Sequence, residues 1–206
     1  MVSNYEKQVD IGKEWFLKYE QEPLAEKFHL NMDETWIYLT YLGRPYRIER
    51  ATGTVLERNQ EVYQECRSYE TVMTIYDMLF HSKERELPPL GGKWMPVANF
   101  AAAGASPSTD TFTRKYADCF SGKTEELKAA CVKLGGEIKA RLAGADVTAE
   151  IPAFPFFPVL LQFWDGDEEF APQVKLLWDD QTMRYLHFET TYYLQGDLLE
   201  RLKRFL

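Results

Sequence analysis

Residues 159–178 have the sequence VLLQFWDGDEEFAPQVKLLW, in which two apolar runs flank an acidic one. Val159–Trp164 is almost wholly apolar, which is typical of a central strand buried on both faces of a sheet. Val174–Trp178 predicts another apolar strand, and the acidic residues around Gly166 predict the turn between them. The segment therefore predicts two buried strands that are joined by an acidic turn.

Further strands are predicted on the N-terminal side of this pair. Residues 146–151 alternate between apolar and polar positions like a strand, and the prolines of residues 153–158 predict a stiff link. Residues 35–56 are rich in β-branched and aromatic side chains and contain two turn signals. They predict a three-stranded antiparallel meander.

Several segments have the periodicity of amphipathic helices. The clearest has apolar residues spaced four and three apart from Val62 to Phe80, and we interpret this stripe as core rather than as a cofactor lining. We expect Pro23 to end the first helix and Gly135-Gly136 to end the fourth, with a short continuation through Ile138 and Leu142. The expected helices cover residues 4–21, 62–80, about 108–120, about 123–134 and 190–206, the last with Leu194, Leu198, Leu202 and Phe205 facing inward.

Composition and charge set limits on the class of protein. The chain has 206 residues, 45% of them hydrophobic, and its 24 basic against 32 acidic residues give a net charge of −8. This balance argues against a nucleic-acid backbone or an anionic membrane as the main partner. No run approaches the roughly 20 apolar residues of a membrane helix, and the N-terminus does not resemble a signal peptide. We expect one α+β domain over residues 1–206, with a mostly antiparallel sheet packed by amphipathic helices, in the cytoplasm.

Cysteine and histidine provide little evidence for catalysis. His29, His81 and His187 lie far apart, and none belongs to an H-x-H or H-E-x-x-H motif, so nothing in their spacing indicates a zinc site, although distant ligands can still assemble one. Phosphate-binding loops, dinucleotide motifs and nucleophile elbows are absent from the sequence. We expect the cysteines to be reduced core residues: Cys66, Cys119 and Cys131.

Residues 101–111, with the sequence AAAGASPSTDT, are rich in small and hydroxyl side chains. Such residues at a helix start leave backbone amides available to an anion, or they simply cap the helix. We favour a surface loop in which Ser106 or Ser108 caps the following helix, because no Lys-Thr or Lys-Ser pair follows.

The acidic turn is the densest group of ionisable side chains. We favour the interpretation that it is a solvated turn, whose charges keep the sheet edge soluble. A second interpretation is a site for Ca²⁺ or Mg²⁺, extended by Asp179 or Glu189. A third is an acid/base pair with one raised pKa, which requires burial between Trp164 and Phe170. The candidate carboxylates are Asp165, Asp167, Glu168 and Glu169.

A succession of motifs in the C-terminal third resembles a known family. The motifs are Gly135-Gly136, Gly144-x-Asp146-Val147, Pro152-x-Phe154-Pro155-x-x-Pro158, Trp164-x-x-Asp167-Glu168-Glu169-Phe170-x-Pro172, and Leu176-x-x-Asp179 with Tyr185-Leu186 ahead of Glu189. Together they resemble domain of unknown function 3786, found mainly in anaerobic bacteria and archaea, best over Gly135 to Leu202.

The resemblance implies a cytoplasmic protein of anaerobes. Some members carry an iron–sulfur module of the type seen in corrinoid proteins; this chain lacks it, so a cluster would belong to a partner. The resemblance implies no reaction, cofactor or catalytic residue.

The leading functional hypothesis is a binding or accessory domain for a protein or small-molecule partner, linked to iron–sulfur or corrinoid-dependent metabolism. It rests on the absence of a complete catalytic motif, on the supply of Trp and Tyr for a recognition surface, and on the family resemblance. One alternative is a divalent-cation-dependent enzyme that uses the acidic turn. Another is a homo-oligomeric structural protein. The sequence indicates no intrinsic cofactor.

Overall fold

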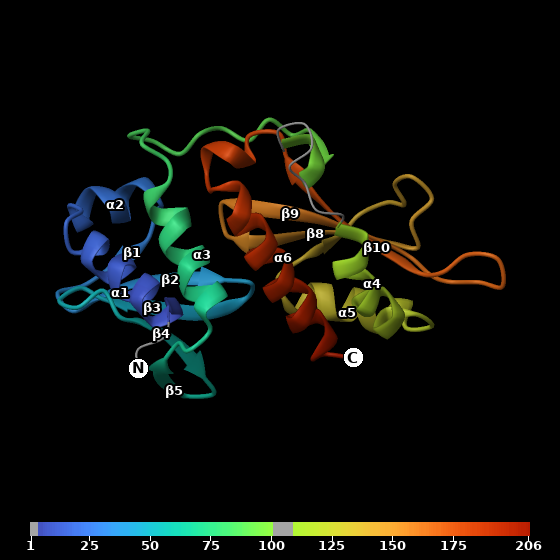
Figure 1. Cartoon of the computed structure of the whole chain (residues 1–206), viewed down its shortest axis with the longest axis horizontal. Helices are drawn as coiled ribbons and strands as arrows, with labels where there is room; N and C mark the ends of the chain where they lie inside the picture. The colour runs from blue at the N-terminus through green and yellow to red at the C-terminus, as the bar shows by residue number, and fades with distance from the viewer. Residues whose placement is uncertain (1–3, 101–108) are drawn as a thin grey trace.

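The N-terminal sheet is a meander of five antiparallel strands in chain order, seen in a computed structural model that describes residues 4–100 and 109–206 (Figure 1). Its inner face is apolar because Ile37 and Leu39 alternate with polar or half-exposed neighbours. The expected meander had three strands, so the observed one has two more. The strands are β1 (Asn31–Met32), β2 (Trp36–Tyr41), β3 (Arg44–Glu49), β4 (Val55–Asn59) and β5 (Val62–Glu65).

The expected helix from Val62 is wrong in its first part. Residues Val62–Glu65 pair with β4 as strand β5, and helix α3 spans only Tyr69–Phe80. Ser68 sets the boundary, since its side chain caps the helix by accepting the amide N–H of Thr71 at 3.2 Å. The four-and-three spacing that extends back to Val62 is coincidental. The interpretation of the helical stripe as core holds for Tyr76 and Phe80, which are buried.

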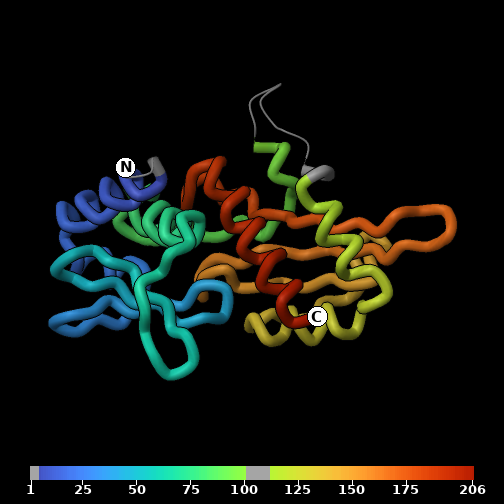
Figure 2. The backbone as a smooth tube through the Cα atoms, turned by 60° about the horizontal axis from the view of Figure 1, so that its bottom comes forward, coloured from blue at the N-terminus to red at the C-terminus, as the bar shows by residue number. Residues whose placement is uncertain are grey.

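The first expected helix is two helices, α1 (Asn4–Phe16) and α2 (Gln21–Lys27). Pro23 lies in the first turn of α2 and does not end α1 as expected. Its missing N–H costs nothing there, because the first amides of a helix have no intrahelical acceptor. Figure 2 shows these helices and α3 on one side of the N-terminal strands.

The C-terminal sheet has the strand order β6-β10-β9-β8-β7, with each neighbouring pair antiparallel. The two apolar runs of residues 159–178 form its adjacent strands β9 and β10, as expected. The prediction of a stiff proline-rich link is wrong, because the strands on both sides extend into residues 153–158 and form a hairpin. The strand pairing shifts register between Pro152 and Phe154, and prolines are tolerated at such an irregularity. The strands are β6 (Trp94–Pro96), β7 (Glu137–Ile138), β8 (Val147–Phe154), β9 (Phe157–Trp164) and β10 (Gln173–Asp179).

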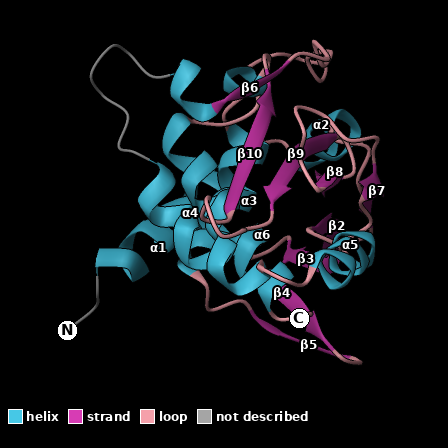
Figure 3. Ribbon diagram, turned by 90° about the vertical axis from the view of Figure 1, so that its right-hand side faces the viewer, coloured by secondary structure: helices cyan, strands magenta, loops and turns pink. Residues whose placement is uncertain are grey.

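The chain that forms this sheet also forms three helices, α4, α5 and α6 (Figure 3). Gly135, with a φ of +84°, ends α5 as predicted, whereas Ile138 continues into strand β7 and not into a helix. Leu194, Leu198 and Leu202 of α6 are buried as expected, but Phe205 is exposed because the helix ends at Lys203. The helices are α4 (Thr109–Phe120), α5 (Thr124–Lys133) and α6 (Phe188–Lys203), and two short 3-10 helices are Val97–Phe100 and Thr182–Arg184.

Two sequence expectations concern smaller features of the fold. Ser106 and Ser108, the expected helix caps, lie outside the described residues. Cys66 and Cys131 are buried as expected, and burial raises the pKa of their thiols to about 11 and about 12, whereas Cys119 is only half-buried. Across residues 4–100 and 109–206, no helix combines the length and the apolar character needed to cross a bilayer.

The two halves of the molecule meet where α3 packs against α6. Asp197 of α6, which is mostly buried, accepts hydrogen bonds from the Thr71 hydroxyl at 2.7 Å and the Tyr41 hydroxyl at 3.0 Å. Burial raises the pKa of this carboxyl, and its hydrogen bonds and the nearby Arg201 only partly oppose that effect. The contact ties α3 and β2 of one half to α6 of the other.

The raised pKa of Asp197 predicts a pH-dependent stability. The folded state holds the proton more tightly than the unfolded chain, so this contribution to stability is present below the ordinary pKa of 3.8 and is lost as the pH rises through the folded-state pKa. Asp197→Asn keeps an oxygen acceptor and removes the titration. We expect the free energy of unfolding of the wild type to fall relative to that of Asp197→Asn as the pH rises above 3.8.

Urea titrations at a series of pH values measure this difference. Asp118→Asn, which removes an exposed carboxylate from α4, controls for the change in net charge. Parallel pH profiles for wild type and Asp197→Asn would contradict the prediction.

Candidate functional site

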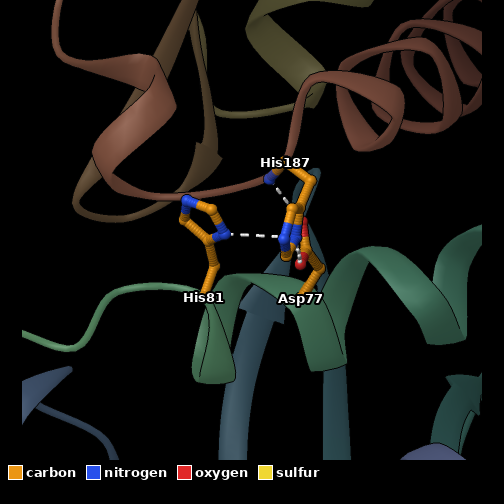
Figure 4. A group of neighbouring side chains, drawn as sticks. All are labelled: Asp77, His81 and His187. Atoms are coloured by element: carbon orange, nitrogen blue, oxygen red, sulfur yellow. Dashed lines mark hydrogen bonds and ion pairs between the residues drawn. The ribbon is translucent and has the colours of Figure 1, made fainter.

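Asp77, His81 and His187 form a side-chain cluster where the end of α3 meets the start of α6 (Figure 4). Asp77 and His81 lie one helical turn apart, so they share a face of α3. His187 is the N-cap residue of α6. We call these three residues the Asp77 cluster. Their ligand atoms all lie within 4.8 Å of one another, and no other group of this kind occurs in the described part of the chain.

The carboxylate of Asp77 is held by the first turn of α6. Its Oδ2 atom accepts the backbone N–H of His187 at 2.8 Å and the hydroxyl of Thr190 at 2.6 Å. Its Oδ1 atom lies 2.5 Å from Nδ1 of His187. A carboxylate at a helix N-terminus is stabilised by the unpaired amides and the positive end of the helix dipole. The orientation of Asp77 is therefore fixed by another element of the fold.

A backbone carbonyl fixes the orientation of His81. Its Nε2 atom lies 2.9 Å from the carbonyl oxygen of Met183, which can only accept a hydrogen bond. This contact assigns the proton of the neutral ring to Nε2 and leaves a lone pair on Nδ1. That Nδ1 atom lies 3.1 Å from Nδ1 of His187, with the two rings inclined at 73°. The lone pair of His81 thus points at the same space as the ligand atoms of the other two residues.

The spacing of the two imidazoles is close to that of a metal site. Zn–N bonds of about 2.0 Å at a tetrahedral angle place two ligand nitrogens roughly 3.3 Å apart. The observed 3.1 Å between the Nδ1 atoms nearly satisfies this requirement. The shorter distance from His187 to Asp77 is that of a hydrogen bond, and an ion in place of the proton would widen it by less than about 1 Å.

An apolar pocket with a volume of about 560 Å³ adjoins the Asp77 cluster. We call it the α1–α3 pocket, because α1 and α3 supply most of its lining. Gly12 permits the close approach of these helices, since a Cβ atom there would lie 2.5 Å from the ring of Tyr76. The lining combines the Asp77 cluster with Gln8, Ile11, Gly12, Trp15, Met73, Tyr76, Phe80 and Lys83.

Solvent reaches the Asp77 cluster mainly at His187. The side chain of Asp77 is 13% exposed and that of His187 is 68% exposed. Lys83, at the edge of the pocket, donates to the hydroxyl of Tyr19 at 2.9 Å and to the carbonyl of Phe80 at 3.0 Å. The arrangement therefore offers two nitrogen ligands and one oxygen ligand beside an apolar space, with Lys83 in the same lining.

In the acidic turn, Asp165 is bound by neighbouring backbone and hydroxyl groups. It accepts the hydroxyl of Ser121 at 2.8 Å and the amide of Gly122 at 3.0 Å. Burial alone would raise the pKa of Asp165, but hydrogen bonds from Gly122, Ser121 and Gly166 outweigh it and lower the pKa. Asp165 therefore lacks the raised pKa that the acid/base hypothesis requires.

The other residues of the acidic turn lie in solvent. Asp167 accepts the amides of Glu169 and Phe170 at 2.8 and 2.7 Å, which closes the turn on itself. Glu168, Glu169 and Phe170 are exposed. Trp164 is half-buried and donates its indole N–H to the carbonyl of Ala143, and it does not cover the carboxylates.

The two supporting carboxylates lie elsewhere. Asp179 is buried and accepts the amides of Gly91, Gly92 and Gln181 at 2.7–2.9 Å. Glu189 is exposed in the first turn of α6. The structure thus brings neither residue to the acidic turn, and the cation hypothesis for Asp165–Glu169 stays a prediction.

Sequence reasoning did not propose the Asp77 cluster. One available signal was the spacing of Asp77 and His81, four residues apart on a predicted helix, which places them on one face. His187 carried no local signal, because its partner Asp77 is 110 residues away.

Comparison with known proteins places the chain in a family. The sequence pattern of the family described as "Domain of unknown function (DUF3786)" matches residues 21–201. The chain belongs to the DUF3786 family. No curated protein and no solved structure matches it. The DUF3786 match extends the expected resemblance from the C-terminal third to nearly the whole chain. It includes all three residues of the Asp77 cluster, whereas α1 lies outside it.

The contacts of Asp179 predict a structural role. Asp179→Ala leaves three amide donors without their acceptor in a buried position. We expect this change to lower the free energy of unfolding by about 3 kcal/mol, measured by urea denaturation. Glu168→Ala, in the exposed acidic turn, should change it by less than about 0.5 kcal/mol. Equal effects of the two substitutions would disprove this assignment.

Proposed function

We propose that this protein is a metal-binding domain that holds one divalent transition-metal ion between Asp77 Oδ1, His81 Nδ1 and His187 Nδ1. The observation that carries the proposal is the contact between His81 Nε2 and the carbonyl of Met183. It commits the only proton of the neutral ring to the backbone and leaves the opposite nitrogen free to bind a metal. Histidines that bind metals in proteins are almost always oriented in this way.

The ligand types favour some ions over others. Imidazole nitrogens suit Zn²⁺, Fe²⁺, Co²⁺ and Ni²⁺, whereas Ca²⁺ and Mg²⁺ prefer sets made only of oxygen. Two histidines and one carboxylate occur in zinc enzymes and in non-haem iron enzymes, where three protein ligands leave a coordination position open. We therefore expect a borderline transition metal with at least one exchangeable position.

A second layer of contacts supports the ligands. The hydroxyl of Thr190 and the backbone N–H of His187 both bind Oδ2 of Asp77, so Oδ1 remains for the ion. The ion would take the place of the proton between His187 and Asp77. Asp77 and His187 already face each other where α3 meets α6, but the three ligand atoms lie up to 4.8 Å apart. A tetrahedral ion needs them roughly 3.3 Å apart, so we expect the side chains to draw together on binding.

This proposal gives the hypothesis of a binding or accessory domain a defined ligand. The alternative of a cation-dependent enzyme at the acidic turn has no comparable support, since Asp165 is occupied by hydrogen bonds and Glu168 is exposed. A cytoplasmic location and a link to iron–sulfur or corrinoid-dependent metabolism are further parts of the proposal. Their support is the family resemblance alone.

Metal binding tests the proposal directly. We expect the metal-free protein to bind one equivalent of Co²⁺ or Zn²⁺ in calorimetry, and the Co²⁺ form to show visible absorption bands of nitrogen and oxygen ligation. His81→Ala should weaken binding on the order of 100-fold or more, because it removes a ligand without touching the contacts of Asp77 with α6.

Two further variants complete the test. Thr190→Val leaves all three ligands in place and removes one supporting contact, so we expect a loss of about 10-fold. His29→Asn changes the histidine that lies outside the Asp77 cluster at a positive φ, a backbone conformation that Asn tolerates, and should leave affinity unchanged. Equal binding by wild type and His81→Ala would refute the proposed site.

The metal is also expected to stabilise the junction of the two halves. An ion that binds only the folded state adds about 2.7 kcal/mol of stability when its free concentration is 100 times the dissociation constant. Thermal unfolding with Zn²⁺ and with a chelator should therefore differ by several degrees for the wild type. The difference should vanish in His81→Ala, and its persistence there would indicate binding at another site.

A further inference from the structure

The proposed metal would lie in the wall of the α1–α3 pocket, because its three ligands belong to the lining. All three residues of the Asp77 cluster line this pocket, so an open coordination position of the metal can be reached from it. Its volume of about 560 Å³ lies within the range of pockets that take small organic molecules. A molecule in the pocket could therefore contact both the metal and the apolar walls.

The charges in the lining of the pocket favour an anion. A divalent ion carries two positive charges and Asp77 carries one negative charge, so the metal site keeps an excess of positive charge. Lys83 also lines the pocket and adds another positive charge, and its two hydrogen bonds leave one of its three N–H groups for a ligand. The pocket lining contains no acidic residue besides Asp77.

The walls favour an apolar body. Ile11 and Trp15 of α1 are 46% and 50% exposed, which is high for large apolar side chains. Both line the pocket, opposite the α3 residues Met73 and Phe80. Covering this surface with an apolar group would remove it from water, which favours binding.

On the basis of the proposed metal site, we propose that the α1–α3 pocket binds a small organic carboxylate with an apolar body. The carboxylate completes the coordination of the metal and accepts a hydrogen bond from Lys83. The apolar body lies against Trp15 and Ile11. The metal supplies affinity for the headgroup, and the α1 wall supplies selectivity for the body.

A titration of the Co²⁺-loaded full chain tests this proposal. The probes are 4-phenylbutyrate, acetate and 4-phenylbutan-1-ol, which separate the carboxylate from the apolar body. We expect 4-phenylbutyrate to shift the visible Co²⁺ bands and to bind about 10-fold or more tightly than acetate, because its body covers apolar surface. The alcohol should bind at least as weakly as acetate.

Variants of the lining residues test whether the probes bind in the α1–α3 pocket. Trp15→Ala and Ile11→Ala should weaken 4-phenylbutyrate several-fold and leave acetate unchanged, whereas Lys83→Met should weaken both acids. Leu17→Ala is the matched control, since Leu17 is 49% exposed beside the end of α1 but does not line the pocket.

The outcomes separate this inference from the proposed function. Equal affinity for acetate and 4-phenylbutyrate, or full affinity in both Trp15→Ala and Ile11→Ala, overturns the carboxylate pocket and leaves the metal site standing. The absence of any Co²⁺ bands before a probe is added overturns the metal site and this inference together.

Discussion

The antiparallel packing of α3 against α6 joins the two halves of the molecule, together with the neighbouring contact between β2 and β8. A carboxylate secures the helix pair at each end. Asp197 accepts the hydroxyl of Thr71 near the start of α3, and Asp77 accepts the hydroxyl of Thr190 near its end. The two contacts use the same chemistry, yet Asp197 is mostly buried among hydrogen-bond donors, whereas Asp77 faces two imidazoles beside solvent. Their different surroundings separate a structural acid from a candidate metal ligand.

Local sequence patterns predicted those parts of the fold that neighbouring residues determine. The apolar strands around the acidic turn and the leucine face of α6 were predictable because period and burial agree along each element. The strand at Val62–Glu65 was missed because its residues continue a helical spacing, and only the cap at Ser68 marks the true start of α3. Which helix packs against which sheet depends on contacts distant in sequence, which one sequence does not contain.

The same distinction explains the candidate site. The acidic turn is a candidate site in the sequence because its charges are adjacent in the chain. A solvated turn also contains adjacent charges, and the exposure of Glu168 agrees with that simpler interpretation. The residues of the Asp77 cluster are not adjacent in the sequence, and the packing of α3 on α6 brings them together. Two of its three residues, Asp77 and His81, form a pair on one helical face that the sequence contains, whereas the third, His187, joins them only in the tertiary structure.

The distance along the chain between Asp77 and His187 has a consequence for how the site is made. The two residues are separated by 110 positions, and α6 is the last helix of the described structure. During synthesis the N-terminal meander and α3 emerge with two ligand side chains in place but with no third ligand and no helix end to orient Asp77. A metal ion captured early by this incomplete pair would be held weakly and exchanged easily. Firm retention would begin only once α6 has docked, so metal retention would report that α3 and α6 have come together.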